Sequence, residues 1–337
     1  MNKLELQKTL ELLQAVGSQN EKNPADLSNK VIVEKDKLIN NFNNSFITVV
    51  EQEFGFEGIF DLTTFVKVVK SLNSDDIELE YNADKKEVIL SALRTKIGLK
   101  ELNIEKLELP IPEKPSKLKS LPEDFLKALQ LCMSCCSRNE YSPLRFIVVN
   151  KDKMIASDQD KIGIYNLQIP LKRTMMIHNA FAQKILALNP VKFVDNDLLL
   201  FFARSDSIYS FCSNFKYDYP DFEKILNKKY DNEIVIPKEL KEATEISVNL
   251  FASLKKEEHT MIVSLQKNRI LIRSESDFGW MDKTIRTKYS GKEISFKINS
   301  VILKQVLDKT DVLKISEDNL AKIEFDNFTY ILPIEKE

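Results

Sequence analysis

The side chains best suited to covalent or metal chemistry in this sequence are four cysteines and two histidines. Cys132, Cys135 and Cys136 share one apolar segment, whereas His178 and His259 lie far from it along the chain. A structural zinc site needs four thiolate or imidazole ligands at suitable spacings, and a cysteine nucleophile needs a base nearby. Neither arrangement is visible in the sequence. The pattern therefore predicts reduced, buried thiols, no metal ion and no cofactor.

An enzyme is the main alternative from another functional class, and the sequence gives it little support. The cysteines lie in an apolar helical segment without a neighbouring histidine to activate them. The paired carboxylates Asp75 and Asp76 lie in a predicted turn, where solvated charge explains them. Only 7 glycines occur in the chain, and no phosphate-binding glycine loop links a predicted strand to a helix. We therefore predict that the protein is not an enzyme, which turnover on a nucleotide or nucleic acid would contradict.

Length and composition indicate a globular chain with more than one domain. A chain of 337 residues is longer than a domain with one hydrophobic core usually is. A content of 43% hydrophobic and 30% charged residues is typical of a folded protein. The sequence shows neither an apolar stretch of ~20 residues nor a signal peptide, so we expect a cytoplasmic protein with no membrane partner. Its 49 basic and 51 acidic residues nearly cancel. Binding to nucleic acid would therefore require the positive charges to gather on one surface.

Six predicted amphipathic helices form an internal repeat. Strand-like sequence follows each helix, and the helix starts fall into two interleaved series with a period of roughly 115 to 120 residues. Asp61, Asn179 and Asn299 can cap three of the helices, while Pro122 and Pro237 suit the first turns of two others. The predicted helices span residues 3–16, 61–72, 122–136, 178–188, 237–254 and 299–309.

The segments between these helices are predicted to be antiparallel strands. Runs such as 30–34, 144–149 and 260–265 are rich in β-branched and aromatic residues, and polar turns separate them. Each repeat is therefore an α+β unit with two helices packed on one face of an antiparallel sheet. A proline-bearing stretch at 109–115 and a polar run at 227–232 are the predicted joints. The predicted domains span residues 1–115, 116–235 and 236–337.

Every basic residue on the polar faces of the six helices is a lysine. On a single helix, lysine on the solvated face needs no special explanation. On six helices that the fold places on one surface, ammonium groups would contact phosphates without reading the bases. The lysines predicted to face DNA are Lys3, Lys8, Lys67, Lys70, Lys127, Lys184, Lys238, Lys241, Lys304 and Lys309.

Four short segments, in their order and spacing, resemble the DNA polymerase III beta subunit family, the bacterial beta sliding clamps. Residues 156–162 (ASDQDKI) resemble the family's Ala-Thr-Asp-Gly-His-Arg-Leu, and residues 219–226 (YPDFEKIL) resemble its Phe-Pro-Asp-Tyr run. Residues 288–299 (KYSGKEISFKIN) resemble Tyr-Ser-Gly followed by a strand and Phe-Asn, and residues 330–334 (YILPI) resemble the closing Met-Pro motif. The resemblance extends over essentially the whole chain.

This resemblance implies a homodimeric DNA sliding clamp with three repeated clamp domains in each chain. Family members are head-to-tail dimers whose six domains form a ring around double-stranded DNA, and they act as processivity factors in DNA replication. The implied partners are duplex DNA of any sequence, a replicative DNA polymerase and a clamp loader. The implied subunit interface involves Ile97, Leu99 and Ile285 on edge strands of the first and third domains.

The resemblance also implies an apolar pocket between the second and third domains that receives a short peptide of each partner. The implied pocket residues are Ser157, Gln159, Lys161, Ile162, Pro220, Ile225, Leu332, Pro333 and Ile334. Two departures concern this pocket. Gln159, Asp160 and Lys161 replace the family's Gly-His-Arg, and Glu335 stands where a basic residue usually follows Met-Pro. The departures leave the fold and the ring unaffected but alter the expected peptide, and they suggest a divergent, phage-encoded member.

Two related functions are alternatives to a dimeric sliding clamp. A trimeric clamp with two domains per chain disagrees with the three repeats, because two chains of three domains already supply the six domains that close a ring. A clamp-like scaffold that binds partners without encircling DNA is disfavoured by the lysines on all six predicted helices. A dimer mass in solution would be the most informative observation.

Overall fold

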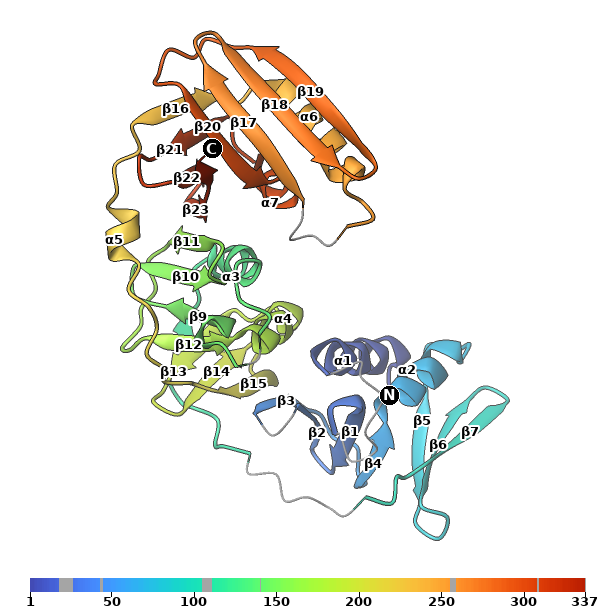
Figure 1. Cartoon of the computed structure of the whole chain (residues 1–337). Coiled ribbons are helices and arrows are strands. Elements are labelled where there is room, and N and C mark those ends of the chain that lie inside the picture. Colours follow the sequence, from blue (N-terminus) through green and yellow to red (C-terminus); the bar gives the residue numbers. More distant parts are fainter. Residues whose placement is uncertain are drawn as a thin grey trace. The chain divides into compact units, whose positions relative to one another are not determined.

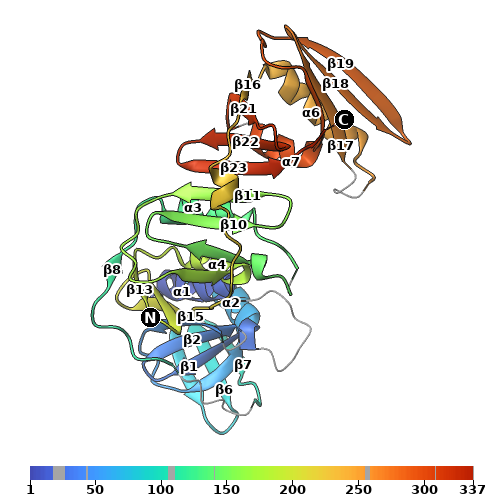
Figure 2. The ribbon, with the colours of Figure 1, turned by 60° about the vertical axis from the view of Figure 1, so that its left-hand side comes forward.

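The computed structural model describes residues 1–17, 27–42, 45–104, 111–139, 141–254, 259–307 and 309–336. The chain divides into two compact units, each of which combines helices with antiparallel sheet (Figure 1, Figure 2). The first unit comprises Met1–Met133, Phe146–Asp152 and Leu167–Tyr217, and the second comprises Ser134–Arg145, Lys153–Asn166 and Asp218–Glu337. Helices and antiparallel sheets in both units confirm the predicted α+β class. In the described ranges, no helix is long and apolar enough to span a membrane.

The centre of the first unit is an eight-stranded antiparallel sheet in the order β4-β1-β2-β3-β15-β14-β13-β8. β3 and β15 come from distant parts of the sequence and lie side by side, with Val50 opposite Ile208. Strands predicted for the first and second domains therefore share one sheet. The strands are β1 Lys30–Glu34, β2 Lys37–Phe42, β3 Phe46–Glu51, β4 Gly58–Asp61, β8 Lys119–Ser120, β13 Lys192–Asp195, β14 Leu199–Ala203 and β15 Ile208–Ser213.

Four helices belong to the first unit, and their apolar stripes explain where they pack. In α1, Leu6, Leu10 and Leu13 recur at helical spacing and are fully buried together with Val33 and Val50 of the sheet. α2 lies beside α1 and contributes to the same core. The helices are α1 Lys3–Val16, α2 Leu62–Ser71, α3 Phe125–Met133 and α4 Asn179–Leu188.

Two of the three predicted asparagine or aspartate caps are confirmed. The Oδ1 atom of Asp61 accepts a backbone N–H of α2, and Oδ1 of Asn299 accepts two backbone N–H groups of the helix that follows it. The prediction for Asn179 is wrong, because Asn179 is the first residue of α4. His178 holds the cap position instead, and its Nδ1 accepts the backbone N–H of Ala180 at 3.1 Å. An unprotonated imidazole nitrogen can act as the acceptor that a helix start needs.

A second, smaller sheet of the first unit has the order β5-β6-β7. Its inward residues Val88 and Leu90 are fully buried, whereas Ile97 and Leu99 of β7 are only partly buried against the same core. β7 is the outer strand of this sheet (Figure 1). Its strands are β5 Glu78–Asn82, β6 Glu87–Ala92 and β7 Thr95–Lys100, and the unit also contains the antiparallel pair β9 Phe146–Val149 and β12 Met175–His178.

The second unit contains two groups of antiparallel strands. Six strands follow the order β10-β11-β23-β22-β21-β16, and five follow the order β19-β18-β17-β20-β24. β19 is the outer strand of the five-stranded sheet in both views (Figure 1, Figure 2). The strands are β10 Lys153–Ser157, β11 Ile162–Asn166, β16 Asn232–Val235, β17 Thr260–Gln266, β18 Arg269–Ser276, β19 Gly279–Arg286, β20 Ile294–Asn299, β21 Val312–Ile315, β22 Leu320–Phe325, β23 Phe328–Pro333 and β24 Glu335–Lys336.

The described residues of the second unit form the α-helices α5 Glu223–Leu226, α6 Lys238–Leu250 and α7 Ser300–Leu307. The sequence does not predict α5, which has a single turn. Pro237 takes the N-cap position of α6 and not its first turn, and Pro122 precedes the start of α3. The predicted helix at 299–309 is confirmed as far as Leu307, and residue 308 lies outside the described residues.

The two units do not coincide with the three predicted domains, because sheets extend across the predicted boundaries. β3 pairs with β15 in the first unit, and β11 pairs with β23 in the second. In both cases a strand from the first half of one repeat pairs with a strand from the second half of the next. The domain limits near residues 115 and 235 therefore stay a prediction from the sequence repeat.

Candidate functional site

The predicted DNA-facing lysines of α1 and α2 divide into solvated and paired side chains. Lys8 and Lys67 are exposed. The Lys70 ammonium lies 2.9 Å from a carboxylate oxygen of Glu11, whose pKa is lowered by hydrogen bonds from Gln7 and then from Lys70. Lys3 donates to backbone carbonyls at the C-terminus of α2. An exposed ion pair contributes only about 0–1 kcal/mol. The Lys70 ammonium is therefore able to exchange its partner for a phosphate.

The lysines predicted on the other helices also include exposed side chains and side chains that lie beside a carboxylate. Lys127 on α3 and Lys238 on α6 are exposed. Lys241 lies 3.9 Å from an oxygen of Asp311, and Lys304 lies 2.9 Å from one of Glu245. Lys309 follows the end of α7, and its ammonium lies 5.5 Å from the centroid of the Phe325 ring. The side chains of these five lysines are exposed or partly exposed, and their contact with DNA stays a prediction.

Lys184 is the exception, and its predicted contact with DNA is wrong for this structure. Its side chain is buried, with 6% of its surface exposed. The ammonium donates to the carbonyl oxygens of Val16 and, at 3.0 Å, Gly17, and lies 3.7 Å from the centroid of the Phe42 ring. It thus satisfies two carbonyls at the C-terminus of α1, where a positive charge is favourable. The sequence placed Lys184 on a solvated face because it could not show that α1 covers this part of α4.

We expect Lys184→Met to lower the free energy of unfolding by about 1–3 kcal/mol, because the buried carbonyl of Val16 and the partly buried carbonyl of Gly17 would lose their donor. Lys8→Met removes the same charge from an exposed position and should change stability by less than about 0.5 kcal/mol. Urea unfolding of both variants provides the measurement. Equal stability of the two variants would contradict the structural role assigned to Lys184.

A buried apolar cluster in the second unit includes one of the residues predicted for the peptide pocket, and a second packs against it. We call it the isoleucine face, and it consists of Ile155, Ile162, Ile164 and Ile331. The register explains why these residues lie together: Ile155 is opposite Ile164, and Ile162 is opposite Ile331. Residues that alternate along neighbouring strands share one side of a sheet. Partly buried side chains packed against the isoleucine face are those of Tyr219, Phe222, Ile225, Leu226 and Leu320.

Several predicted pocket residues lie at or beside the isoleucine face. Ile162 belongs to it, and Ile225 of α5 packs against it. Pro333 is exposed and lies opposite Leu320 at the end of β23. Pro220 is exposed in the segment that leads into α5. Neighbouring strands and the short helix α5 therefore assemble an apolar surface with a solvated border.

The loop between β10 and β11 supplies polar groups beside this surface. Ser157 is buried, and its hydroxyl donates to the carbonyl of Lys161 at 2.9 Å. The Lys161 ammonium lies 3.2 Å from a carboxylate oxygen of Asp158. Burial raises the pKa of Asp158 above its usual value, although the Lys161 charge opposes this effect. Gln159 is exposed, with a positive φ of 84°. The loop thus carries the ion pair of Lys161 and Asp158 together with the exposed carboxylate of Asp160.

Leu332 and Ile334 do not lie on the isoleucine face. Along β23 the side chains alternate, so that Ile331 and Leu332 point to opposite sides of the sheet. Leu332 and Ile334 are both buried, with 2% and 4% of their surfaces exposed. The residues that follow form β24, which pairs with β20. Removing the last six residues would therefore damage the core of the second unit, and point substitutions are the appropriate test of partner binding.

The sequence analysis missed most of the isoleucine face. Ile155, Ile164 and Ile331 were not among the predicted pocket residues, although alternation along β10 and β11 is a signal that could have found the first two. The positions of the Tyr219 and Phe222 side chains depend on the path of the backbone segment that leads into α5. A single helical turn gives no periodic signal, so the sequence alone could not place them.

The predicted subunit interface falls on two edge strands, as expected. Ile97 and Leu99 lie on β7, and Ile285 lies on β19. The side chain of Ile285, however, is buried within its own chain, with 2% of its surface exposed. A charged residue at position 285 would disturb that core. Trp280 of the same strand is 70% exposed and is therefore a better probe of a contact at this edge.

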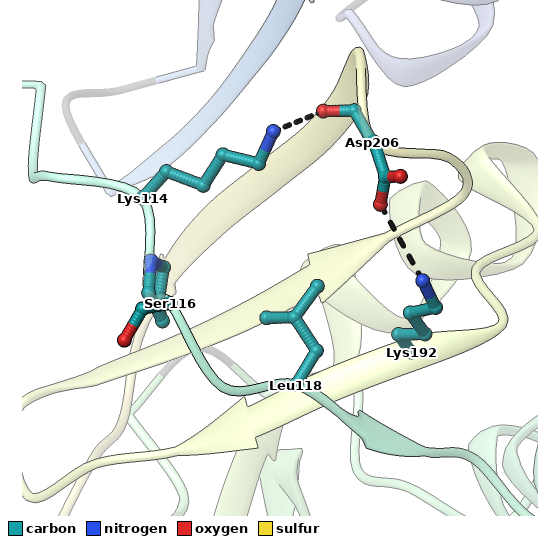
Figure 3. A pocket seen from close by; sticks show the side chains of 6 residues that line it. Lys114, Ser116, Leu118, Lys192 and Asp206 are labelled. Atoms are coloured by element: carbon teal, nitrogen blue, oxygen red, sulfur yellow. Dashed lines mark hydrogen bonds and ion pairs between the residues drawn. The ribbon is translucent and has the colours of Figure 1, made fainter.

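The predicted joint at 109–115 is described from residue 111 onward. Ile111 and Leu118 pack against an apolar cluster that includes Tyr209. Figure 3 shows Lys114 and Lys192 directed at Asp206: Lys114 donates to its backbone carbonyl, and the Lys192 ammonium lies 3.4 Å from its carboxylate. These contacts fix the described end of the joint to the strand pair β14 and β15.

Metal and thiol chemistry have no evident site in the described part of the chain. No group of three or more His, Cys, Asp or Glu residues is positioned there to hold a metal ion. All four cysteines are free and buried. Burial raises the pKa of Cys135 to about 12, and burial also raises that of Cys136 and Cys212. Such thiols stay protonated at neutral pH and are poor nucleophiles.

Helices packed on antiparallel sheets, with sheets that continue from one sequence repeat into the next, define the fold of the bacterial sliding clamps. A solved structure of a putative DNA polymerase III beta subunit from Eubacterium rectale has a TM-score of 0.84 at 16% identity and covers 99% of this chain and 98% of that chain. The beta subunit of DNA polymerase III from Thermotoga maritima has a TM-score of 0.83 at 12% identity, covering 99% and 98%.

The Helicobacter pylori beta clamp bound to a DNA ligase peptide is also similar, with a TM-score of 0.78 at 18% identity and coverage of 99% and 98%. No family model and no curated protein matches the sequence. At these identities the likeness establishes the fold. The chain thus has the clamp fold that the sequence resemblance predicted.

Proposed function

We propose that this protein is a divergent DNA sliding clamp, a homodimer that encircles duplex DNA and tethers a replicative polymerase to it. The whole-chain likeness to beta clamps supports the proposal. The proposed function requires no catalytic group. A clamp loader and a cytoplasmic location follow from the same proposal. The observation that carries it most directly is that β7 and β19, the strands at equivalent positions in the first and third repeats, are edge strands of their sheets in the described part of the chain.

Two junctions within the chain show how clamp repeats join. β3 of the first repeat pairs with β15 of the second, and β11 of the second pairs with β23 of the third. The third repeat then leaves the corresponding strand β19 as an edge, and the first repeat leaves β7. Exposed edges expose unpaired backbone groups. Pairing β19 of one chain with β7 of a second copy would form a third junction of the same kind. Head-to-tail pairing at both ends of each chain would then close a dimer.

The exposed lysines support contact with DNA in such a dimer. Lys8, Lys67, Lys127 and Lys238 belong to four different helices, and each is exposed. Ammonium groups bind phosphates without regard to base sequence, and salt weakens each contact. We therefore assign to these lysines the positioning of the duplex, while closure of the dimer retains it.

The isoleucine face is the proposed receptor for partner peptides. The clamp of Helicobacter pylori has been solved with a DNA ligase peptide. In this chain, the partly buried side chains of Tyr219, Phe222 and Ile225 pack on the four buried isoleucines and provide apolar surface for the aliphatic or aromatic anchors of a peptide.

We expect a solution mass of twice 38.9 kDa for the intact protein. Trp280→Glu and Leu99→Glu place charges on the two proposed edges and should give monomers, because an unpaired charge would be buried on association. Leu198→Glu is the matched control, since Leu198 is 75% exposed in the turn between β13 and β14, and this variant should remain dimeric. Light scattering and circular dichroism measure mass and folding. A folded Trp280→Glu dimer, or a monomeric parent protein, would contradict the proposed pairing.

A further inference from the structure

The two junctions within the chain share one register, and this register can be transferred to the proposed contact between two copies. At the first junction, Ile208, the first residue of β15, lies opposite Val50 of β3. At the second junction, Phe328, the first residue of β23, lies opposite Tyr165 of β11. At both junctions, the first residue of the strand from the later repeat, β15 or β23, therefore occupies the same position in the pairing.

Val50 and Tyr165 hold equivalent positions in their own hairpins. Val50 lies opposite Leu38, the second residue of β2, and Tyr165 lies opposite Met154, the second residue of β10. Both second residues are fully buried. The hairpin of β18 and β19 repeats this arrangement. In it, the second residue of β18 is Ile270, which is also fully buried, and it lies opposite Ile285.

We propose that a second copy of this chain adds its β7 to β19 in a single register, with Thr95 opposite Ile285. The inference rests on the proposed function and specifies the partner surface of the dimer. Thr95 is the first residue of β7, as Ile208 and Phe328 are of β15 and β23. Counting along antiparallel strands then fixes every other pair. The pairs are Thr284 with Lys96, Lys283 with Ile97, Asp282 with Gly98, Met281 with Leu99, and Trp280 with Lys100.

On the outer side of this contact, the register brings together complementary groups. Lys96, Gly98 and Lys100 are exposed on β7, as are Asp282 and Trp280 on β19. Asp282 would face the glycine, which has no side chain, and would lie diagonally between the two lysines, within reach of their long side chains. The Lys100 ammonium would meet the face of Trp280, the only tryptophan of the chain.

On the inner side, the same register completes a partly covered core. Leu99 and Ile97 are only partly buried in the single chain. Met281, also partly buried, would cover Leu99. The ammonium of Lys283 lies 3.5 Å from a carboxylate oxygen of Glu242, which leaves its methylene stem to cover Ile97. A shift by one residue would place these apolar side chains against Thr284, Asp282 or Trp280 and turn the charges inward.

A cysteine scan tests the register. Lys96→Cys is combined in turn with Thr284→Cys, Asp282→Cys and Trp280→Cys, all at exposed positions on one side of the strands. Directly opposite residues approach closely enough for a disulfide, whereas diagonal neighbours lie about 7–8 Å apart. Oxidation should give at least about tenfold more cross-linked dimer with Thr284→Cys than with either other partner. The native cysteines are buried and add little background.

A charge exchange provides an independent readout. Asp282→Lys should weaken dimerisation at least about tenfold by placing like charges next to Lys96 and Lys100, and adding Lys96→Glu should recover most of the loss. A maximum of cross-linking at Asp282→Cys or Trp280→Cys in a dimeric protein would overturn the register while leaving the proposed function intact. A parent protein that stays monomeric at every concentration would instead contradict the proposed function.

Discussion

After loading, the protein should stay on closed circular duplex DNA at salt concentrations that break ordinary electrostatic complexes, and it should leave linear DNA rapidly. Each lysine–phosphate contact is screened over about 8 Å at physiological ionic strength. A protein held by such contacts alone would lose roughly 10³-fold or more in affinity between 50 and 200 mM salt. A closed dimer is held by topology and escapes only over a free end. We therefore expect at least about tenfold longer residence on circles than on linearised molecules of the same sequence in high salt.

The measurement compares retention on circular and linearised plasmid by gel filtration after loading. Cutting the plasmid after loading is the matched control, because DNA sequence, protein and salt are unchanged. Replacing Lys8, Lys67, Lys127 and Lys238 by alanine should reduce loading while leaving the dimer mass unchanged, since all four are exposed. Equal loss from circular and linear DNA would mean that the protein does not encircle the duplex, and the clamp-like scaffold would then be the better account.

The helices were predictable because their apolar residues recur at the helical period. The predicted span of α1 agrees with the structure at both ends, Lys3 and Val16, and the leucines that predicted it are the buried ones. The caps formed by Asp61 and Asn299 were also predictable, because a capping side chain bonds only to backbone N–H groups in the first turn of its own helix. His178 escaped prediction because imidazole is a less common cap than the asparagine beside it. Local interactions of this kind can be inferred from one sequence.

The remaining features depend on contacts between distant residues. Lys184 is buried because its ammonium meets carbonyls of α1, more than 160 residues away in the sequence. Ile331 faces Ile162 because β11 pairs with β23, and that register decides which side of β23 belongs to the isoleucine face. A resemblance in the closing motif located this strand but could not distinguish Ile331 from Leu332. Strand register must be known before residues on a sheet can be assigned to one face.

The largest effect on partner binding is expected from Ile225→Glu. Ile225 lies on α5, is partly buried and packs against the isoleucine face. A carboxylate at this position would have to be desolvated beneath a bound peptide, and loss of a central apolar anchor typically costs about 2–4 kcal/mol. We therefore expect the affinity for the replicative polymerase encoded by the same genome to fall about 30-fold to 1,000-fold, with the dimer mass unchanged.

Lys224→Glu is the matched control for this prediction, because it introduces the same side chain at the exposed neighbouring position of α5. It should alter the affinity by less than about threefold, as expected for a charge at the rim of an interface. Surface plasmon resonance with the immobilised clamp measures both variants, and primer extension on a long template reports the consequence for processivity. Ile225→Glu should shorten the extended products to the length made without the clamp. If both variants bound the polymerase as tightly as the parent protein, the partner surface would have to lie elsewhere than on the isoleucine face, even in a protein that encircles DNA.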